Sequence, residues 1–208
     1  MRRQQKTDED LVVEALAGSA AAFEGLLRRY QRPVLSLVTR MVRDPALAED
    51  LAQDAFIRAF RNLGSFDSSR KFKSWLFKIA HNRTIDHLRR RQPREVPLEQ
   101  TSASGEEMWE VLEAPEEESP HRRAESRELA SEVDRALSQL RPSYREVLLL
   151  RFQQGLAYHE IAEVTGLPMS SVKVQLHRGR KQLAKLLEAA GLSAPEAFAP
   201  KPSPSKAQ

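Results

Sequence analysis

A run of cationic side chains near the C-terminal end of the chain is the strongest sign of chemistry in the sequence. Residues 169–187 contain no acidic residue. The polar face of the helix that they predict carries Lys173, Gln175, His177, Arg178, Arg180 and Lys181. Ammonium and guanidinium groups hold phosphates, and guanidinium and amide groups also read base edges. This set therefore predicts binding to DNA rather than catalysis.

Two helices separated by a tight turn must position these side chains. The first helix has an apolar face formed by Tyr158, Ile161 and Ala162. Gly166 suits a turn with positive φ, Pro168 prevents the first helix from continuing, and Ser170 or Ser171 is expected to cap the second. The buried side of the second helix is expected to carry Val172, Leu176, Leu183 and Leu187. The pattern predicts a helix-turn-helix, whose second helix enters the DNA major groove. The alternative is a helical hairpin with a solvated face, but such a face normally mixes charges of both signs.

A second cationic stretch, residues 57–94, has aromatic side chains interleaved with its Lys and Arg residues. It contains eleven Lys or Arg residues and two acids, Asp67 and Asp86. Its aromatic residues include Phe66, Phe72, Trp75 and Phe77. Exposed rings stack on bases while cations hold phosphates, as in proteins that bind single strands. The alternative is that the aromatic rings belong to the hydrophobic core and that the Lys and Arg side chains only keep the protein soluble. Helical spacing places three residues in the core, Phe72, Leu76 and Ile79, and leaves Trp75 at its border.

The residues before this stretch predict three helices. Thr7 and Asp10 resemble a capping box, and Gly18 closes the first helix. The second begins after Ser19, and Pro33 predicts a kink or break near Tyr30. The third begins at Asp44-Pro45. Its inner side is expected to carry Leu47, Leu51, Ala55 and Phe60. Residues 62–70 are small and polar and predict a loop, with Phe66 in the middle.

An acidic segment separates the two cationic parts. Residues 96–121 contain eight glutamates and no Lys or Arg. The whole chain has a net charge of +4, so the chain without this segment carries +12. Helix is expected to resume near Ala124, with its inner side formed by Leu129, Val133, Leu137 and Leu140. The sequence predicts an all-α fold of two small helical domains joined by a flexible acidic linker, the second containing the helix-turn-helix. The expected ranges are residues 8–95, linker 96–122, residues 123–190 and a disordered tail 191–208.

The composition argues against several classes of protein. With no cysteine, the chain has no disulfide or thiolate metal site, and its five histidines form no close pair with a carboxylate. No apolar run reaches the roughly 20 residues of a membrane span, and the N-terminal residues lack a signal-peptide core. We therefore expect a cytoplasmic protein without direct membrane insertion, which is not an enzyme and uses no metal or cofactor.

Three segments together resemble a bacterial RNA polymerase sigma factor of the extracytoplasmic-function (ECF) subgroup. They are DLAQDAFIRAFRNLGSF, FKSWLFKIAHNRTIDHLRRR and LSQLRPSYREVLLLRFQQGLAYHEIAEVTGLPMSSVKVQLHRGRKQL, within residues 8–187. Each motif alone is weak, but their order and spacing make the resemblance specific. It implies a protein that binds core RNA polymerase, at the β′ clamp and the β flap, and directs it to promoter DNA. Many relatives are held by an anti-sigma factor, so the resemblance also implies such a partner.

The resemblance assigns roles to three groups of residues. The surface that packs on the β′ clamp corresponds to Asp50, Gln53, Asp54, Phe56, Ile57 and Arg58. Recognition and melting of the −10 element correspond to Phe66, Lys73, Trp75, Lys78, Asn82, Arg83, Asp86, Arg89 and Arg90. The loop of residues 62–72 corresponds to the family's specificity loop, which captures a flipped base of the −10 element, and Phe66 and Asn82 fall where the residues of that pocket are expected. Recognition of the −35 element corresponds to Lys173, Val174, His177, Arg178, Arg180 and Lys181. Val174 and His177 lie at positions where the family varies, which leaves the −35 sequence open.

Two other interpretations stay open at this stage. The linker glutamates could imitate a nucleic-acid backbone in the RNA-exit path, or the linker could be an inert tether. The whole chain could instead be a stand-alone helix-turn-helix regulator, which would bind duplex DNA without polymerase. A nuclease is less favoured, because its metal would need clustered carboxylates.

Overall fold

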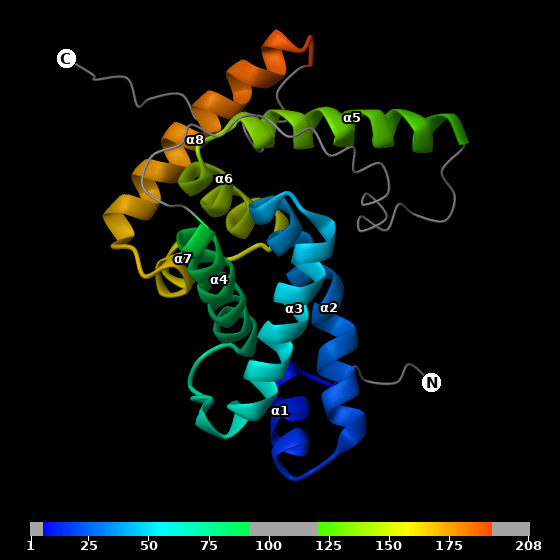
Figure 1. Cartoon of the computed structure of the whole chain (residues 1–208), viewed down its shortest axis with the longest axis vertical. Coiled ribbons are helices and arrows are strands. Elements are labelled where there is room, and N and C mark those ends of the chain that lie inside the picture. Colours follow the sequence, from blue (N-terminus) through cyan, green and yellow to red (C-terminus); the bar gives the residue numbers. More distant parts are fainter. Residues whose placement is uncertain (1–5, 92–119, 193–208) are drawn as a thin grey trace, which may run out of the picture. The chain divides into compact units, whose positions relative to one another are not determined.

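The computed structural model describes residues 6–91 and 120–192 of the 208-residue chain (Figure 1). Every regular element in these two stretches is helical, which confirms the predicted all-α fold. The elements are α1 (Asp8–Leu16), α2 (Ala20–Val42), α3 (Pro45–Arg61), the 3₁₀-helix η1 (Leu63–Ser65), α4 (Phe72–Arg91), α5 (Pro120–Gln139), α6 (Pro142–Leu148), the π-helix η2 (Leu149–Gln153), α7 (Tyr158–Thr165) and α8 (Met169–Ala189). Most of the predicted acidic linker and the tail from residue 193 lie outside the described residues.

Contacts divide the chain into two compact units. The first contains α1 to α4 together with residues 159–167, and the second contains α5, α6, η2 and α8. The predicted domain boundaries at residues 95 and 96 lie outside the described residues. The predicted domain ranges therefore stay predictions.

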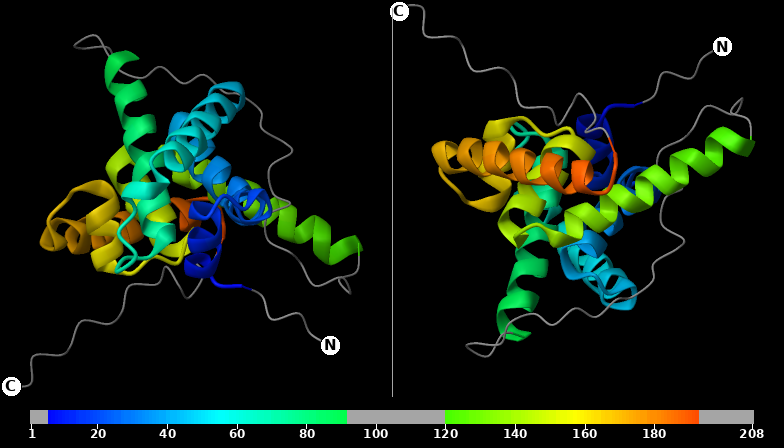
Figure 2. Two further views of the ribbon diagram at one scale, coloured as in Figure 1. Left: turned by 90° about the horizontal axis from the view of Figure 1, so that it is seen from below. Right: turned by 90° about the horizontal axis from the view of Figure 1, so that it is seen from above.

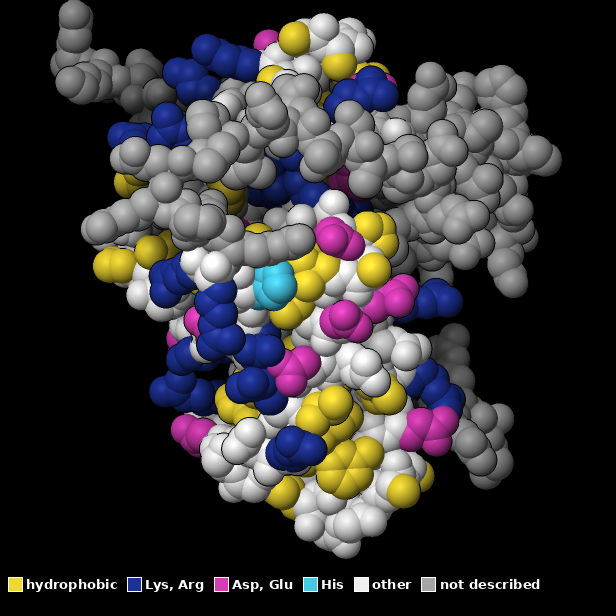
Figure 3. All heavy atoms as spheres, in the orientation of Figure 1, with side chains coloured by type: hydrophobic (Ala, Val, Ile, Leu, Met, Phe, Trp, Pro, Cys, Tyr) yellow, Lys and Arg dark blue, Asp and Glu magenta, His cyan; other side chains and the backbone are white. Residues whose placement is uncertain are grey.

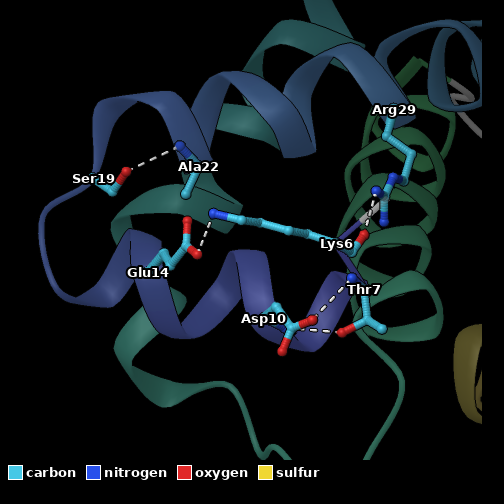
Figure 4. Close-up of polar contacts among 7 residues, drawn as sticks. All are labelled: Lys6, Thr7, Asp10, Glu14, Ser19, Ala22 and Arg29. Carbon is cyan, nitrogen blue, oxygen red and sulfur yellow. Dashed lines mark hydrogen bonds and ion pairs between the residues drawn. The ribbon is translucent and has the colours of Figure 1, made fainter. Parts of the chain in front are cut away.

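The first three helices begin where the sequence predicts. Thr7 and Asp10 form the capping box, in which each side chain accepts from the backbone N–H of the other at 3.1 Å (Figure 4). Ser19 accepts from the Ala22 N–H at 3.3 Å, and Asp44 caps α3. These bonds satisfy backbone donors that a helix N-terminus otherwise leaves without partners.

Helix α2 is continuous through Pro33, so of the kink or break predicted near Tyr30 the break does not occur. Proline removes one helical hydrogen bond. Residues on both sides of it are buried in one core, with Leu26 and Tyr30 before it and Val34 and Leu37 after it. Packing along the whole helix compensates for the lost bond.

Helix α3 lies beside α2 (Figure 2) and carries a row of buried alanines. The buried alanines are Ala48, Ala52, Ala55 and Ala59. Leu47 and Phe60, predicted on the inner side, are only half-buried. The buried stripe is therefore centred on small residues, which allow the two helices to approach closely.

Helix α4 completes the core of the first unit. Phe72 and Leu76 are buried as predicted, but Ile79 is half-buried. Phe77, predicted among the interleaved aromatic residues, is fully buried and packs edge-on against Tyr30 at 6.5 Å between ring centroids. Phe77 is therefore core, which removes it from any surface that could stack on a base.

In the second unit, a buried arginine holds the end of α5. The Arg145 guanidinium donates to the carbonyl oxygens of Leu137, Ser138 and Leu140 at 2.8–3.1 Å. Carbonyls at a helix C-terminus have no partner further along the helix, although that of Leu137 also accepts from the Leu140 N–H at 3.1 Å. Helix α5 begins at Pro120, earlier than the predicted residue 124. Leu129, predicted inward, is 43% exposed, and among residues 129–139 of α5 the buried ones are Ala136 and Leu137.

Helix α8 packs closely on α6 at Gly179. A Cβ atom there would lie 3.2 Å from Leu148 Cδ1 and from Tyr144 Cβ, so any larger residue would have to push these side chains slightly away. The predicted buried stripe of α8, from Val172 to Leu187, is confirmed. The predicted cap is wrong: α8 begins after Pro168, so Ser170 and Ser171 lie inside its first turn.

Two neighbouring leucines of α2 allow a matched test of this packing. Leu26 is fully buried and Leu27 is 37% exposed. Leu26→Ala should lower the free energy of unfolding by about 2–5 kcal/mol, because it leaves a cavity. Leu27→Ala should lower it by less than about 1 kcal/mol. Urea unfolding followed by circular dichroism measures both, and equal losses would contradict the assigned orientation of α2.

Candidate nucleic-acid interface

The predicted −35 residues lie on one exposed side of α8. Lys173, His177, Arg178 and Lys181 are exposed, and Val174 is 46% exposed. Arg180 is half-buried, with its guanidinium 5.9 Å from the centroid of the Phe152 ring. The structure therefore brings these residues together on one helix. A cationic face with one exposed apolar side chain suits phosphates and a thymine methyl group.

Helix α7, the break after it and helix α8 follow one another in the order that the sequence predicts. Gly166 has a φ of +70°, as expected for the residue that ends α7. Ile161 and Val164 are buried on α7, whereas Tyr158, predicted on its apolar face, is 37% exposed. Instead, the Arg151 guanidinium lies 5.3 Å from the centroid of the Tyr158 ring.

The predicted −10 residues of α4 follow one another along an accessible stripe. Lys78, Asn82, Asp86, Arg89 and Arg90 are exposed, and Lys73, Trp75 and Arg83 are half-buried. Figure 3 shows Lys and Arg side chains gathered on the part of the surface where α4 lies. Partial burial lowers the pKa of the Lys73 ammonium group. The stripe combines cations with an amide and an indole, which suits a nucleic-acid strand.

Aromatic contacts connect the loop to α4. The Phe66 ring lies 5.3 Å from the Trp75 ring and 5.8 Å from the Phe72 ring, measured between centroids. Phe72 is fully buried, whereas Phe66 and Trp75 are partly accessible. That Phe66 and Trp75 touch was not predicted from the sequence. The loop and the helix therefore present one aromatic surface.

Local hydrogen bonds shape the loop that carries Phe66. The Asp67 carboxylate accepts from the Ser69 N–H at 3.0 Å, and hydrogen bonds to Ser69 lower the pKa of Asp67. Asn62 donates to the Arg58 carbonyl at 2.8 Å at the end of α3. The Asp67–Ser69 bond is an Asx turn, which together with the Asn62 contact fixes a short loop without a core of its own.

The predicted polymerase-binding residues lie on α3, but not all at its surface. Asp50, Gln53, Ile57 and Arg58 are exposed, Ile57 by 41%. Phe56 is only 6% exposed, so its side chain supports this face from the core. Asp54 is half-buried and accepts hydrogen bonds from Arg58 and Arg83. The Asp54–Arg83 contact joins residues 29 positions apart, and no spacing rule could have found it.

Other functions find no support among the described residues. Within residues 6–91 and 120–192, no group of three or more His, Cys, Asp or Glu residues is placed to hold a metal ion. In the same part of the chain, no helix is long and apolar enough to cross a membrane.

Comparison with known protein families identifies the family of this chain. Residues 26–94 match Sigma-70 region 2, and residues 130–183 match Sigma-70, region 4. The chain is 36% identical over 187 residues to the RNA polymerase sigma-H factor of Pseudomonas aeruginosa, covering 88% of this chain and 95% of the relative. It is also 36% identical over 171 residues to the ECF RNA polymerase sigma factor SigW of Bacillus subtilis, covering 82% and 91%.

The chain belongs to the ECF sigma factors. This confirms the resemblance drawn from the three motifs. As a sigma factor, the protein directs promoter-specific initiation by RNA polymerase, and the stand-alone regulator is not favoured.

Solved structures agree with this assignment. The structure of CnrH in complex with the cytosolic domain of CnrY is similar, with a TM-score of 0.62 and 27% identity over 88% of this chain and 99% of that chain. The sigma factor RpoE of Bartonella quintana, in complex with the anti-sigma factor NepR, has the same fold, with a TM-score of 0.59 and 21% identity over 80% of this chain and 96% of that chain.

Proposed function

We propose that this ECF sigma factor reads the −10 element with the loop of residues 62–72 and α4, and the −35 element with α8. The observation that carries the proposal is that most cationic side chains of both helices are exposed, while the apolar stripes of these helices are largely buried. The domains then comprise residues 8–95 and 123–190. Because the two surfaces read separate elements, promoter specificity requires both.

At the −10 element, the aromatic surface formed by Phe66 and Trp75 receives an unstacked base of the non-template strand. Unstacking a base costs a few kcal/mol, and stacking on an aromatic side chain returns about 1–3 kcal/mol per base. Asn82 supplies hydrogen bonds to the flipped base. Lys73, Lys78, Arg89 and Arg90 hold the strand's phosphates. Asp86 accepts from base amino groups.

At the polymerase, the exposed side of α3 packs on the β′ clamp. Asp50 and Gln53 offer acceptors, and Ile57 offers exposed apolar area at the same face. An exposed apolar residue ringed by polar ones is typical of a protein interface. Phe56, being buried, stiffens this face and does not contact the clamp directly.

The proposed setting is the cytoplasm, where core polymerase supplies the chemistry and this chain contributes no catalytic group. CnrH and the Bartonella quintana RpoE were solved bound to CnrY and to the anti-sigma factor NepR, respectively. We infer that an anti-sigma factor also binds this chain.

Transcription with purified components tests the function. Core polymerase with the full-length chain should initiate at new sites on genomic DNA, and sequencing the transcripts should show two shared elements upstream of those sites. Failure to associate with core enzyme, or unchanged start sites, would overturn the proposal. Strong specific binding of duplex DNA without polymerase would favour the stand-alone regulator.

Trp75→Ala should slow promoter opening while sparing closed-complex formation. Losing one stacking platform should reduce the opening rate roughly tenfold, given about 1–3 kcal/mol per stacked base. Permanganate reactivity of unpaired thymines measures opening, and gel shift measures the closed complex. Trp75→Phe keeps a ring and should recover most of the rate. Permanganate reactivity in Trp75→Ala equal to that of the wild type would falsify this role.

Lys173→Ala and Arg178→Ala should weaken transcription from promoters that depend on the −35 element without weakening core binding. Each variant that loses a phosphate contact should reduce the salt dependence of holoenzyme binding by about one unit of log–log slope. Lys185→Ala removes an exposed cation of α8 that is not among the proposed −35 residues, and it serves as the matched control. If Lys185→Ala has the same effect, α8 contributes only general positive charge.

A further inference from the structure

Asp54 is a residue of α3, and its carboxylate accepts hydrogen bonds from two arginines, one on α3 and one on α4. Its Oδ2 atom accepts from Nε of Arg58 at 3.1 Å and also from Nε of Arg83. Arg58 belongs to α3, four residues further on, whereas Arg83 belongs to α4. One carboxylate therefore connects the proposed polymerase-binding helix to the proposed DNA-binding helix.

Arg83 differs from its neighbours on α4 in how much of it is accessible. Its side chain is 23% exposed, whereas Lys78 and Asn82 are exposed. A guanidinium that is paired with a carboxylate must break that charge-assisted hydrogen bond before it binds a phosphate in the same direction. In this structure Arg83 therefore gives less attraction to DNA than its position in the stripe suggests.

Asp54, in contrast, remains open to a partner. Its side chain is 35% exposed, and it shares one helix with the exposed acceptors Asp50 and Gln53. Three acceptors on one helix fit a partner surface that carries cationic donors. Such a donor would compete with Arg83 for the same carboxylate.

We propose that Asp54 is a positioning residue that withholds Arg83 from DNA in the free chain and releases it when polymerase docks on α3. This inference rests on the proposed function, because it takes α3 as the polymerase-binding face and α4 as the DNA-binding face. Docking and strand binding are then coupled through one carboxylate. Because coupling between two binding events is reciprocal, bound DNA also tightens the hold on polymerase.

The first test uses the free full-length chain and a fluorescent oligothymidine of about twelve nucleotides, within the usual size of single-strand sites. A phosphate contact is independent of sequence, so this probe detects a released Arg83. Asp54→Asn should bind the probe roughly three- to tenfold more tightly at low salt than the wild type. The log–log slope with salt should steepen by about 0.7, the value for one added phosphate contact to a single strand.

Glu49→Gln is the matched control, because it removes one exposed acid from the same helix. It should change the affinity much less than Asp54→Asn. The double variant Asp54→Asn with Arg83→Ala should bind no more tightly than Arg83→Ala alone. Equal gains in Glu49→Gln and Asp54→Asn, or a gain that persists without Arg83, would overturn the proposal. Weaker binding in Asp54→Asn would also overturn it, because Asp54 would then orient Arg83 toward DNA.

The second test adds core polymerase at a saturating concentration. Holoenzyme formation should increase the wild type's affinity for the probe more than that of Asp54→Asn, because the variant has already released Arg83. An equal increase in both would overturn the coupling. If wild-type holoenzyme does not form or does not bind DNA, the proposed function itself fails. If it does both and only the Asp54 variants behave like their controls, the function stands and this inference alone is wrong.

Discussion

The burial of Phe72 at the start of α4 is the contact on which the proposed −10 surface depends. Its ring packs against Tyr30 of α2 at 5.6 Å, and against Phe66 and Trp75 on its other sides. Tyr30 in turn donates from its hydroxyl to Asp8 of α1, and burial raises the pKa of that hydroxyl. A short loop with little core of its own is thereby fixed to three helices. The aromatic surface can then be preformed before a base arrives, which lowers the entropy lost on binding.

Charge is organised differently on α4 and α8, the two helices proposed to face DNA. Residues 169–187 of α8 contain no acid, so most cations of this stretch face outward without an acidic neighbour in it, and Glu188 lies only at the end of the helix. Helix α4 has its cations beside acids, with Asp86 on the helix itself and Asp54 across from Arg83. Uncompensated charge favours early, long-range attraction to DNA. Compensated charge adds little until its partner is displaced, which suits contacts that form after polymerase has bound.

Local signals in the sequence were sufficient for much of the fold and the outline of the site. The caps at Thr7, Ser19 and Asp44 depend on neighbouring residues, and the apolar stripe of α8 follows the helical period, so both could be predicted. The burial of Phe77 and the exposure of Leu129 depend on where other helices pack, which periodicity does not contain. The π-helix, the Arg145 contacts and the Asp54–Arg83 pair also depend on residues that meet only in the folded chain. The three motifs together predicted the family, because their order restricts the possibilities far more than one helix-turn-helix does.

The close approach at Gly179 has a consequence for how promoter preference can diverge. Because Leu148 and Tyr144 leave little room for a methyl group, rotating or sliding α8 on α6 would disturb this contact. Exchanging outward side chains such as Val174 and His177, which are proposed to face DNA, leaves the contact unchanged and is therefore the less disruptive way to alter the DNA sequence that is read. A lineage could acquire a new regulon by such exchanges while keeping the interior of this unit intact.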